Sequence, residues 1–180
     1  MARQIKQKEC IKTERLELKS FRSCDLEQIK DLLTNEEIAK TFMVPEFESE
    51  KQVRNLANKL IENSKPEDTA HLEYGVYLND TLIGFINNCE FGEDEIEIGY
   101  VIHPDHKGRG YATEVVSAVI QDLFRMGFTK VVTGYFEKNT ASRRVMEKCG
   151  MHQIERSDVV EYRGVNHVCR YFEITNPETN

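Results

Sequence analysis

Glycine and basic residues alternate in one short segment of this chain, residues 107–112, which reads KGRGYA. Before this segment, apolar residues repeat at every second position, as in a strand; after it, they repeat every three or four positions, as in a helix. The first turn of a helix leaves backbone N–H groups unpaired, and the helix dipole adds positive potential there. Because glycines let an anion approach those donors, the spacing predicts a phosphate cradle at this helix start.

The loop alone leaves a second interpretation open, because Gly-X-Gly turns also cap helices that bind no ligand. The longer phrase is more specific. A Glu-Ile-Gly-Tyr strand, Pro104, and the run Lys107-X-X-Gly110-X-Ala112 together resemble the acetyl-CoA loop of the GCN5-related N-acetyltransferase (GNAT) family. The family pattern is Gln or Arg, two residues, Gly, one residue, and then Gly or Ala. Gly110 and Ala112 match this pattern, whereas Lys107 stands where Gln or Arg is usual.

A second motif follows, NTAS at residues 139–142 and EKCGM at residues 147–151. It is similar to the Asn-X-X-Ser and Glu-Lys-X-Gly-Phe pattern of the Rim-type ribosomal-protein N-terminal acetyltransferases, with Met151 in the place of Phe. A helix with an Asn cap and a Gly stop would explain each of these residues singly. The two motifs together, at this separation, favour the family resemblance.

The resemblance implies that acetyl-CoA binds along the loop, the end of the preceding strand and the second motif. Asn139 would face the pantetheine or the substrate amide, and backbone N–H groups near Val101 would stabilise an oxyanion. The cofactor-binding residues implied in this way are Val101, Ile102, His103, Lys107, Gly108, Arg109, Gly110, Tyr111, Ala112, Thr113, Asn139 and Ser142.

Acetyl transfer to an amine needs a proton acceptor, because lysine-type amines titrate near ~10.4 and α-amines near ~8, and so are mostly protonated at neutral pH. Glu97 is the candidate general base, since it shares a strand face with Glu95 and Gly99 beside the implied opening in the sheet. Glu95 is the second choice. The alternative for both residues is an ordinary solvated position on a strand.

Ser142 is the candidate proton or hydrogen-bond donor to the departing thiolate, one turn into the helix of the second motif. It could equally complete the helix cap. Many family members use a Tyr further along this helix as general acid, but seven residues after Asn139 this chain has Met146, which cannot donate a proton. Either Ser142 acts, therefore, or the CoA thiolate leaves without help.

Charged residues gather near both motifs. The basic ones, which could meet the cofactor phosphates, are Lys107, Arg109, Lys138, Arg143, Arg144 and Lys148. Two acidic blocks could favour a cationic amine if they flank the cleft, or could be solvated loops. Their members are Glu36, Glu37, Glu46, Glu48 and Glu50 in one block, and Glu90, Glu93, Asp94, Glu95 and Glu97 in the other.

The elements that must position these residues follow from hydrophobic periodicity. The pattern predicts a strand, two helices, three strands, a helix, a strand, a helix and a closing two-stranded hairpin. This order gives an α+β fold with three mixed α/β/α layers. The GNAT resemblance implies a central, mostly antiparallel seven-stranded sheet, splayed at the cofactor site, with about four helices. Residues 1–12 are expected to be a loose lead-in, and residues 13–175 a single N-acetyltransferase domain.

Composition narrows the class of protein. The chain has 180 residues, 39% hydrophobic and 31% charged, with a net charge of −7 that argues against nucleic acid as a partner. It shows no apolar run that suits a membrane span and no secretory signal pattern. Its five cysteines form no Cys-X-X-Cys pair, which favours a reducing cytoplasm over a disulfide framework or a zinc site. His103 and His106 form a pair without a third ligand, so no metal is expected.

The sequence therefore predicts an enzyme that transfers an acetyl group from acetyl-CoA to a primary amine by direct attack. The acceptor could be a peptide or protein N-terminus, which the Rim-type resemblance favours, or a small-molecule amine. A homodimer is possible by family analogy. The alternative function is a non-catalytic, CoA-binding regulatory domain. A phosphate-binding NTPase is excluded because the chain has no Gly-X-X-X-X-Gly-Lys-Ser/Thr sequence.

Overall fold

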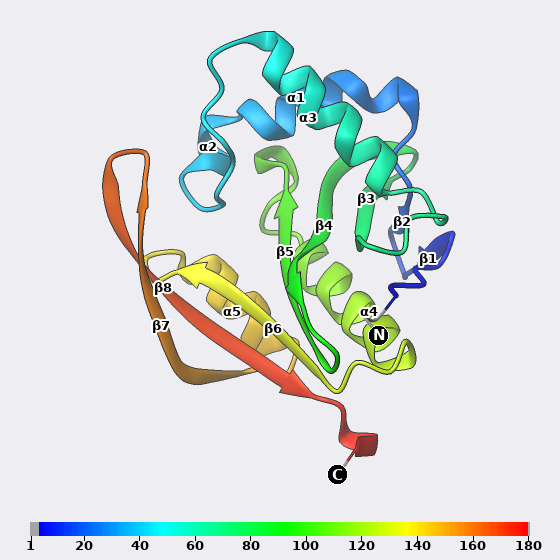
Figure 1. Cartoon of the computed structure of the whole chain (residues 1–180), viewed down its shortest axis with the longest axis vertical. Helices are drawn as coiled ribbons and strands as arrows, with labels where there is room; N and C mark the ends of the chain where they lie inside the picture. The colour runs from blue at the N-terminus through cyan, green and yellow to red at the C-terminus, as the bar shows by residue number, and fades with distance from the viewer. Residues whose placement is uncertain (1–3, 180) are drawn as a thin grey trace.

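Eight strands form one sheet in the computed structural model, which describes residues 4–179 (Figure 1). The strands are β1 (Cys10–Lys12), β2 (Glu17–Lys19), β3 (Glu73–Leu78), β4 (Thr81–Phe91), β5 (Glu95–Ile102), β6 (Lys130–Phe136), β7 (His152–Tyr162) and β8 (Val165–Thr175). Their order in the sheet is β1-β2-β3-β4-β5-β6-β8-β7. Every neighbouring pair is antiparallel except β5 and β6, so a single crossover through a helix joins two antiparallel halves.

Helices cover both faces of the sheet, as the three-layer prediction required (Figure 1). They are α1 (Leu26–Thr34), α2 (Glu36–Ala39), α3 (Glu50–Asn63), α4 (Tyr111–Arg125) and α5 (Thr140–Lys148). The stripe of α4, with Val115, Val119 and Leu123 fully buried, packs with α5 on one face. Helices α1 and α3 cover the other face, where Val101 of β5 joins their cluster.

The sheet opens between β5 and β6. These two strands pair over only three positions, from Glu95 opposite Lys130 to Glu97 opposite Val132. The Thr133 hydroxyl then donates to the Ile98 carbonyl oxygen at 2.8 Å, and beyond that bond the strands diverge. The expected splay beside the Glu95 strand is confirmed.

The sheet has eight strands rather than the seven expected, because β1 lies inside the expected lead-in. Of that lead-in, residues 1–3 lie outside the described residues. Ile5 is fully buried and its N–H donates to the Thr69 carbonyl at 2.9 Å, while the Gln7 amide donates to the Ser64 carbonyl at 2.8 Å. Single apolar residues in a polar segment have no periodicity to detect, which explains the missed strand.

The structure has five α-helices where about four were expected, and the additional one is α2. It has only four residues, and the Asn35 side chain caps it by accepting hydrogen bonds from the N–H groups of Glu37 and Ile38. The predicted order of elements has no helix between α1 and α3. Within residues 4–179, no helix combines the length and apolar character that a membrane span requires. All five cysteines lie in this described part and are free thiols.

Candidate active site

The glycine loop ends in the first turn of α4. Gly108 and Gly110 have φ angles of 75° and 82°, a left-handed conformation that other residues rarely adopt. Gly110 is the N-cap of α4, and no side chain of the described residues makes a capping hydrogen bond there. The backbone donors of the first turn therefore have no side-chain cap, which is the arrangement that a phosphate cradle requires.

Arg15 holds this loop from the other end of the chain. Its guanidinium donates to the Arg109 carbonyl oxygen at 2.9 Å, pairs with Glu114 at 2.7 Å, and lies 4.6 Å from the centre of the Tyr111 ring. The Thr13 hydroxyl donates to the same Glu114 carboxylate at 2.6 Å. This clamp was missed by sequence reasoning, because nothing in the spacing connects residues almost one hundred positions apart.

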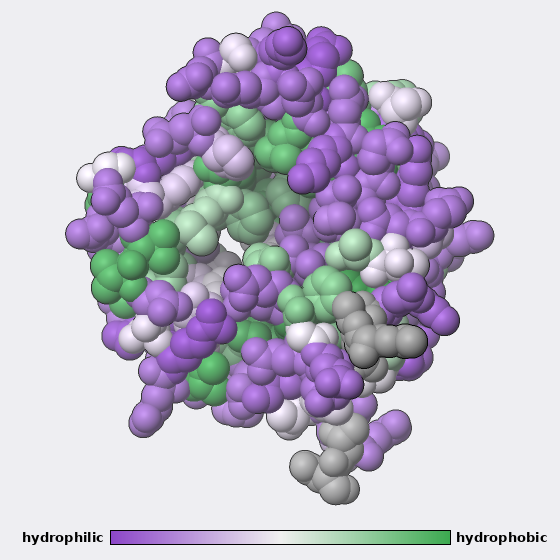
Figure 2. Space-filling view, in the orientation of Figure 1, coloured by the Kyte–Doolittle hydropathy of each residue, from purple (hydrophilic) through white to green (hydrophobic). Residues whose placement is uncertain are grey.

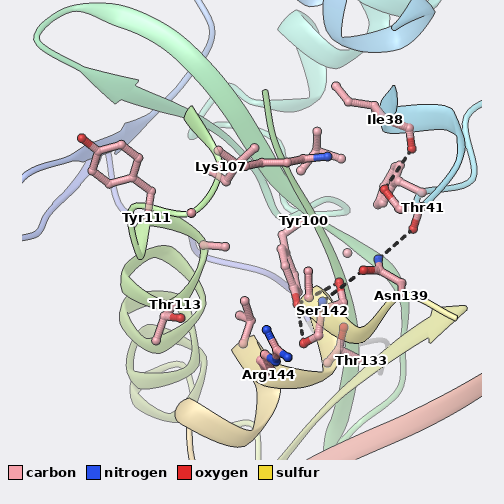
Figure 3. Close-up of a pocket in the computed structure, with 18 of the residues that line it drawn as sticks. Ile38, Thr41, Tyr100, Lys107, Tyr111, Thr113, Thr133, Asn139, Ser142 and Arg144 are labelled. Atoms are coloured by element: carbon pink, nitrogen blue, oxygen red, sulfur yellow. Dashed lines mark hydrogen bonds between the residues drawn. The ribbon is translucent and has the colours of Figure 1, made fainter. Parts of the chain in front are cut away.

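A cavity of about 360 Å³ fills the opening between β5 and β6. Figure 3 shows Tyr100, Ser142 and Asn139 converging on it from β5 and from the start of α5, with Lys107 extending across from the loop. Figure 2 shows the molecule hollowed between the helices at the top and the β7–β8 hairpin. The predicted cofactor residues that line the cavity are Val101, Ile102, Lys107, Gly108, Gly110, Tyr111, Ala112, Thr113, Asn139 and Ser142.

Two predicted cofactor residues lie outside this lining. His103 turns toward α1, where its ring Nε2 lies 3.0 Å from an Asp31 carboxylate oxygen. The Arg109 guanidinium folds back toward the Asp105 carbonyl oxygen, 3.5 Å away. Neither side chain enters the cavity, because successive side chains of a strand or turn cannot all face one cleft.

Ser142 lies against the hydroxyl group of Tyr100, a residue that was not among the predicted site residues. The Tyr100 hydroxyl lies 3.3 Å from the Ser142 Oγ and 3.4 Å from the Ser142 carbonyl oxygen (Figure 3). Burial raises the pKa of Tyr100, so its phenol stays protonated and able to donate. Met146, in contrast, is fully buried.

Asn139 is committed to the protein on both sides of its amide. Its Oδ1 accepts from the Ser142 N–H at 3.2 Å, which is the helix-cap alternative, and its Nδ2 donates to the Thr41 carbonyl oxygen at 3.4 Å (Figure 3). Thr41 and Phe42 belong to the segment after α2 and line the cavity together with Ile38, which lies in α2 itself. None of these three residues was among the predicted cofactor residues, so this part of the cavity wall was missed.

Glu97 does not line the cavity. It lies two residues before Gly99, which does, and by strand alternation the two share a face of the sheet. A side chain at Gly99 would meet the Phe42 ring at 3.1 Å, so this face looks toward the segment after α2. We call the surface formed by Glu97, Gly99 and Phe42 the acceptor face; Tyr100 and Ser142 lie on the opposite side of β5.

The Glu97 carboxylate is half-buried and bonded to a residue that sequence reasoning did not single out. Arg156 Nη1 lies 3.1 Å from Glu97 Oε2. Burial raises the pKa of Glu97, and the Arg156 charge offsets part of that rise. Glu95, the second choice, is exposed and pairs with Lys130 at 3.4 Å, where β5 and β6 are still paired.

Only some of the basic residues predicted to meet the cofactor phosphates lie at the cavity. Lys107, Arg144 and Lys148 line the cavity, whereas Arg143 turns along its helix to pair with Glu147 at 2.9 Å. Several acids of the two acidic blocks are also neutralised by neighbours. These pairs are Glu36 with Arg163, Glu37 with Lys40, Glu50 with Lys30, Glu95 with Lys130 and Glu97 with Arg156.

Comparison with known proteins agrees with this geometry. The profile of the Acetyltransferase (GNAT) domain matches residues 15–152. An uncharacterized N-acetyltransferase of Bacillus subtilis, YnaD, is 28% identical over 145 residues, which cover 79% of this chain and 82% of YnaD. Among solved structures, a GNAT-family acetyltransferase from Bacillus anthracis is 28% identical with a TM-score of 0.76, covering 92% of this chain and 98% of that one.

A second solved structure shares the fold at lower identity. RimL, a ribosomal L7/L12 alpha-N-protein acetyltransferase solved with coenzyme A, has a TM-score of 0.79 at 16% identity, covering 93% of this chain and 98% of RimL. The domain match spans both motifs, the splayed strand and the whole cavity lining, which runs from Ile38 to Lys148. The chain therefore belongs to the GNAT family and is an N-acetyltransferase.

Proposed function

We propose that this protein transfers the acetyl group of acetyl-CoA to a primary amine by direct attack, with Glu97 as general base. The observation that carries the proposal is the position of the cavity. It begins at the uncapped start of α4, passes through the opening between β5 and β6, and reaches Gly99 beside Glu97. A thioester held in that opening would be exposed to an amine on the acceptor face.

The residues of the cavity suit acetyl-CoA. Backbone amides at Gly110 and the first turn of α4 offer hydrogen bonds to a diphosphate, and Lys107, Arg144 and Lys148 supply positive charge. The middle of the lining is less polar, with Tyr100 and Val145 among its walls. The coenzyme A reported in the RimL structure, which shares this fold, supports the same assignment.

Glu97 would accept the proton that the amine loses. The carboxylate form is required, so activity should fall as the pH drops through the pKa of Glu97. Burial raises that pKa above its ordinary value of 4.5, which brings the group closer to the basicity that proton transfer from an ammonium requires. An amine reaching Gly99 from the side of Phe42 would pass this carboxylate.

The developing oxyanion needs donors inside the opening. Backbone groups of successive strand residues point to opposite sides. Ile98 faces β6, because its carbonyl accepts from Thr133, whereas the His103 N–H donates to Ile83 of β4. By this alternation the N–H groups of Tyr100 and Ile102 face the opening and that of Val101 faces β4. We therefore assign the oxyanion donor to Tyr100 or Ile102 instead of Val101.

Two hydroxyl groups are placed to assist the departing thiolate. The Tyr100 phenol can donate to the Ser142 Oγ, 3.3 Å away, which leaves the Ser142 hydrogen free to point into the cavity. A thiolate there would receive a hydrogen bond from Ser142 without any role for Met146. The pair replaces the single tyrosine that many family members carry on this helix.

The acceptor is proposed to be a peptide or protein N-terminus or a small-molecule amine. RimL, named as an alpha-N-protein acetyltransferase, supports the first class. Pairing of several acids with nearby cations weakens the case for a strongly cationic acceptor such as a polyamine. An α-amine, which is less basic than an alkylamine, is also easier for a carboxylate to deprotonate.

The test is to mix the protein with acetyl-CoA and a panel of peptide N-termini and small amines, and to follow free thiol. We expect amine-dependent thiol release that falls roughly 100-fold or more in Glu97→Gln, while calorimetry shows unchanged affinity for coenzyme A. Glu95→Gln is the matched control and should keep its activity. Tight binding of coenzyme A with no thiol release across the panel would contradict the proposal and indicate a regulatory binding domain.

A further inference from the structure

The guanidinium of Arg156 reaches Glu97 across the width of two strands. Arg156 belongs to β7 and Glu97 to β5, and the sheet order places β6 and β8 between them. The two side chains nevertheless meet at 3.1 Å. An ion pair between adjacent strands would not have to span two further strands. The Arg156–Glu97 contact therefore depends on the direction in which the backbone orients each side chain.

Irregular backbone lies at both ends of the contact. On β7, Gln153 pairs with Phe172 and Ser157 with Arg170, so four steps along β7 oppose two along β8, and Arg156 lies in the bulge. On β4, Asn88 pairs with Ile98 and Glu90 with Glu97, which leaves an extra residue opposite the Glu97 end of β5. Bulges re-aim side chains and are common next to active sites.

Arg156 is also held in place by its own strand and by β8. Its guanidinium lies 3.8 Å from the centre of the Tyr171 ring, and its Nε lies 3.7 Å from an Asp158 carboxylate oxygen. The Tyr171 hydroxyl donates to that same carboxylate at 2.8 Å. A flexible surface arginine would lose side-chain entropy to make one pair, whereas this one is fixed by three neighbours.

We propose that Arg156 is a positioning residue that keeps the Glu97 carboxylate ionised and holds it by Oε2, so that Oε1 is presented to the acceptor amine. The inference rests on the proposed role of Glu97 as base. Within the described residues only Oε2 has a protein hydrogen-bond partner, and the Glu97 side chain keeps 19% of its surface exposed. The Glu97 side chain is thus partly open to solvent, with Oε1 left without a protein partner among the described residues.

Among the charged groups of the described chain that act most strongly on Glu97, Arg156 is the cation. Burial and the acids Glu90 and Glu95 raise the pKa of Glu97, and Arg156 opposes them. Without Arg156, the carboxylate would bind a proton more readily. The groups that interact electrostatically with Glu97 are Cys89 and Glu90 from β4, Glu95 from β5, Arg156 from β7, and Cys169 and Tyr171 from β8. Asp158 of β7 lies against Arg156.

The test compares Arg156→Met and Arg156→Lys with the wild type in two readouts. The first is the pH profile of kcat/KM, whose acid limb should move up by roughly one pH unit in the Met variant and less in the Lys variant. Added guanidinium should restore part of the lost rate. Arg170→Met is the matched control. It removes an arginine from β8, the strand next to β7, and this arginine pairs with Glu137 at 2.8 Å instead of with Glu97.

The second readout does not need turnover. Carboxyl carbon NMR, with the Glu97 signal assigned from its loss in Glu97→Gln, should show the Glu97 titration moving up in Arg156→Met and unchanged in Arg170→Met. An unchanged titration, or a rate loss equal at every pH, would overturn the inference. If the wild type released no thiol with any amine, the proposed function would fail, while the NMR titration would still decide whether Arg156 controls Glu97.

Discussion

The two sides of β5 are built in different ways. On the cofactor side, the loop, the start of α4 and the start of α5 come from short continuous motifs, and ten of the twelve predicted cofactor residues line the cavity. On the acceptor face, Gly99 faces Phe42 from the segment after α2, while Arg156 reaches Glu97 from a bulge in β7. Under the proposed function, the comparison teaches that binding of acetyl-CoA is encoded locally, whereas control of the amine is assembled by the fold.

The largest expected effect is a loss of affinity for coenzyme A when the glycine loop on the cofactor side is altered. Gly110→Val places a branched side chain at φ 82°, which strains the backbone by roughly 1–3 kcal/mol and should lower affinity for coenzyme A tenfold or more. Calorimetry measures this. Gly164→Val is the matched control, since its φ is 71° and no atom lies within 4 Å of the new Cβ. Equal affinity losses in both variants would contradict the local cradle.

Arg15→Ala tests whether the cradle needs support from the chain's first strands. Loss of its bonds to Arg109 and Glu114 should raise KM for acetyl-CoA roughly threefold to tenfold, about 1 kcal/mol, with kcat little changed. Steady-state kinetics gives both constants. Arg54→Ala, which removes a surface arginine paired with Glu50, is the control for charge. A fall in kcat at constant KM would show that Arg15 acts elsewhere.

Tyr100→Phe sharpens the boundary between the two sides, because Tyr100 lies on the strand that separates them. We expect kcat to fall roughly threefold to tenfold as the hydrogen bond to Ser142 is lost, with affinity for coenzyme A retained. In a double-mutant cycle with Ser142→Ala, the two losses should be less than additive. Full additivity would mean that the two hydroxyls act independently.

The smallest effect concerns stability and its pH dependence. Burial opposes ionisation of Glu114, but hydrogen bonds from Thr13 and Arg15 outweigh it and lower the pKa of Glu114 below 4.5. Thr13→Val should therefore cost about 1 kcal/mol of unfolding free energy at neutral pH. Part of this difference should vanish as the pH falls through the depressed pKa, because the carboxylate is then protonated in both proteins.

Urea denaturation at several pH values measures that difference. Thr34→Val, which removes a hydroxyl bonded only to a helix carbonyl, should show a loss that does not change with pH. A Thr13→Val difference that grew toward acid pH would have the wrong sign for a stabilised carboxylate.

Regular elements with strong periodicity were predictable from sequence. Strand β6 runs over Lys130–Phe136 as expected, and the sheet opens beside Glu97 as the family resemblance implied. Strand β1 and helix α2 were not predictable, since three- and four-residue elements carry too little pattern. Their stability comes from tertiary packing, which a linear sequence does not display.

The candidate site divides along the same line. Gly110 and Ser142 are found by motif, because backbone geometry and helix capping restrict residue type locally. Arg15 and Arg156 were missed because each acts across the fold, on Glu114 and on Glu97. Tyr100 was not among the predicted site residues, and only the structure shows that its hydroxyl lies beside Ser142 at the cavity.

A crystal structure with bound coenzyme A tests the central claim most directly. The account predicts the diphosphate on the backbone amides around Gly110 and the first turn of α4, and the sulfur in the opening between β5 and β6 near Ser142. Glu97 should then lie on the acceptor face with Arg156 still attached. A diphosphate bound elsewhere, or a sulfur on the far side of β6 from Glu97, would contradict it.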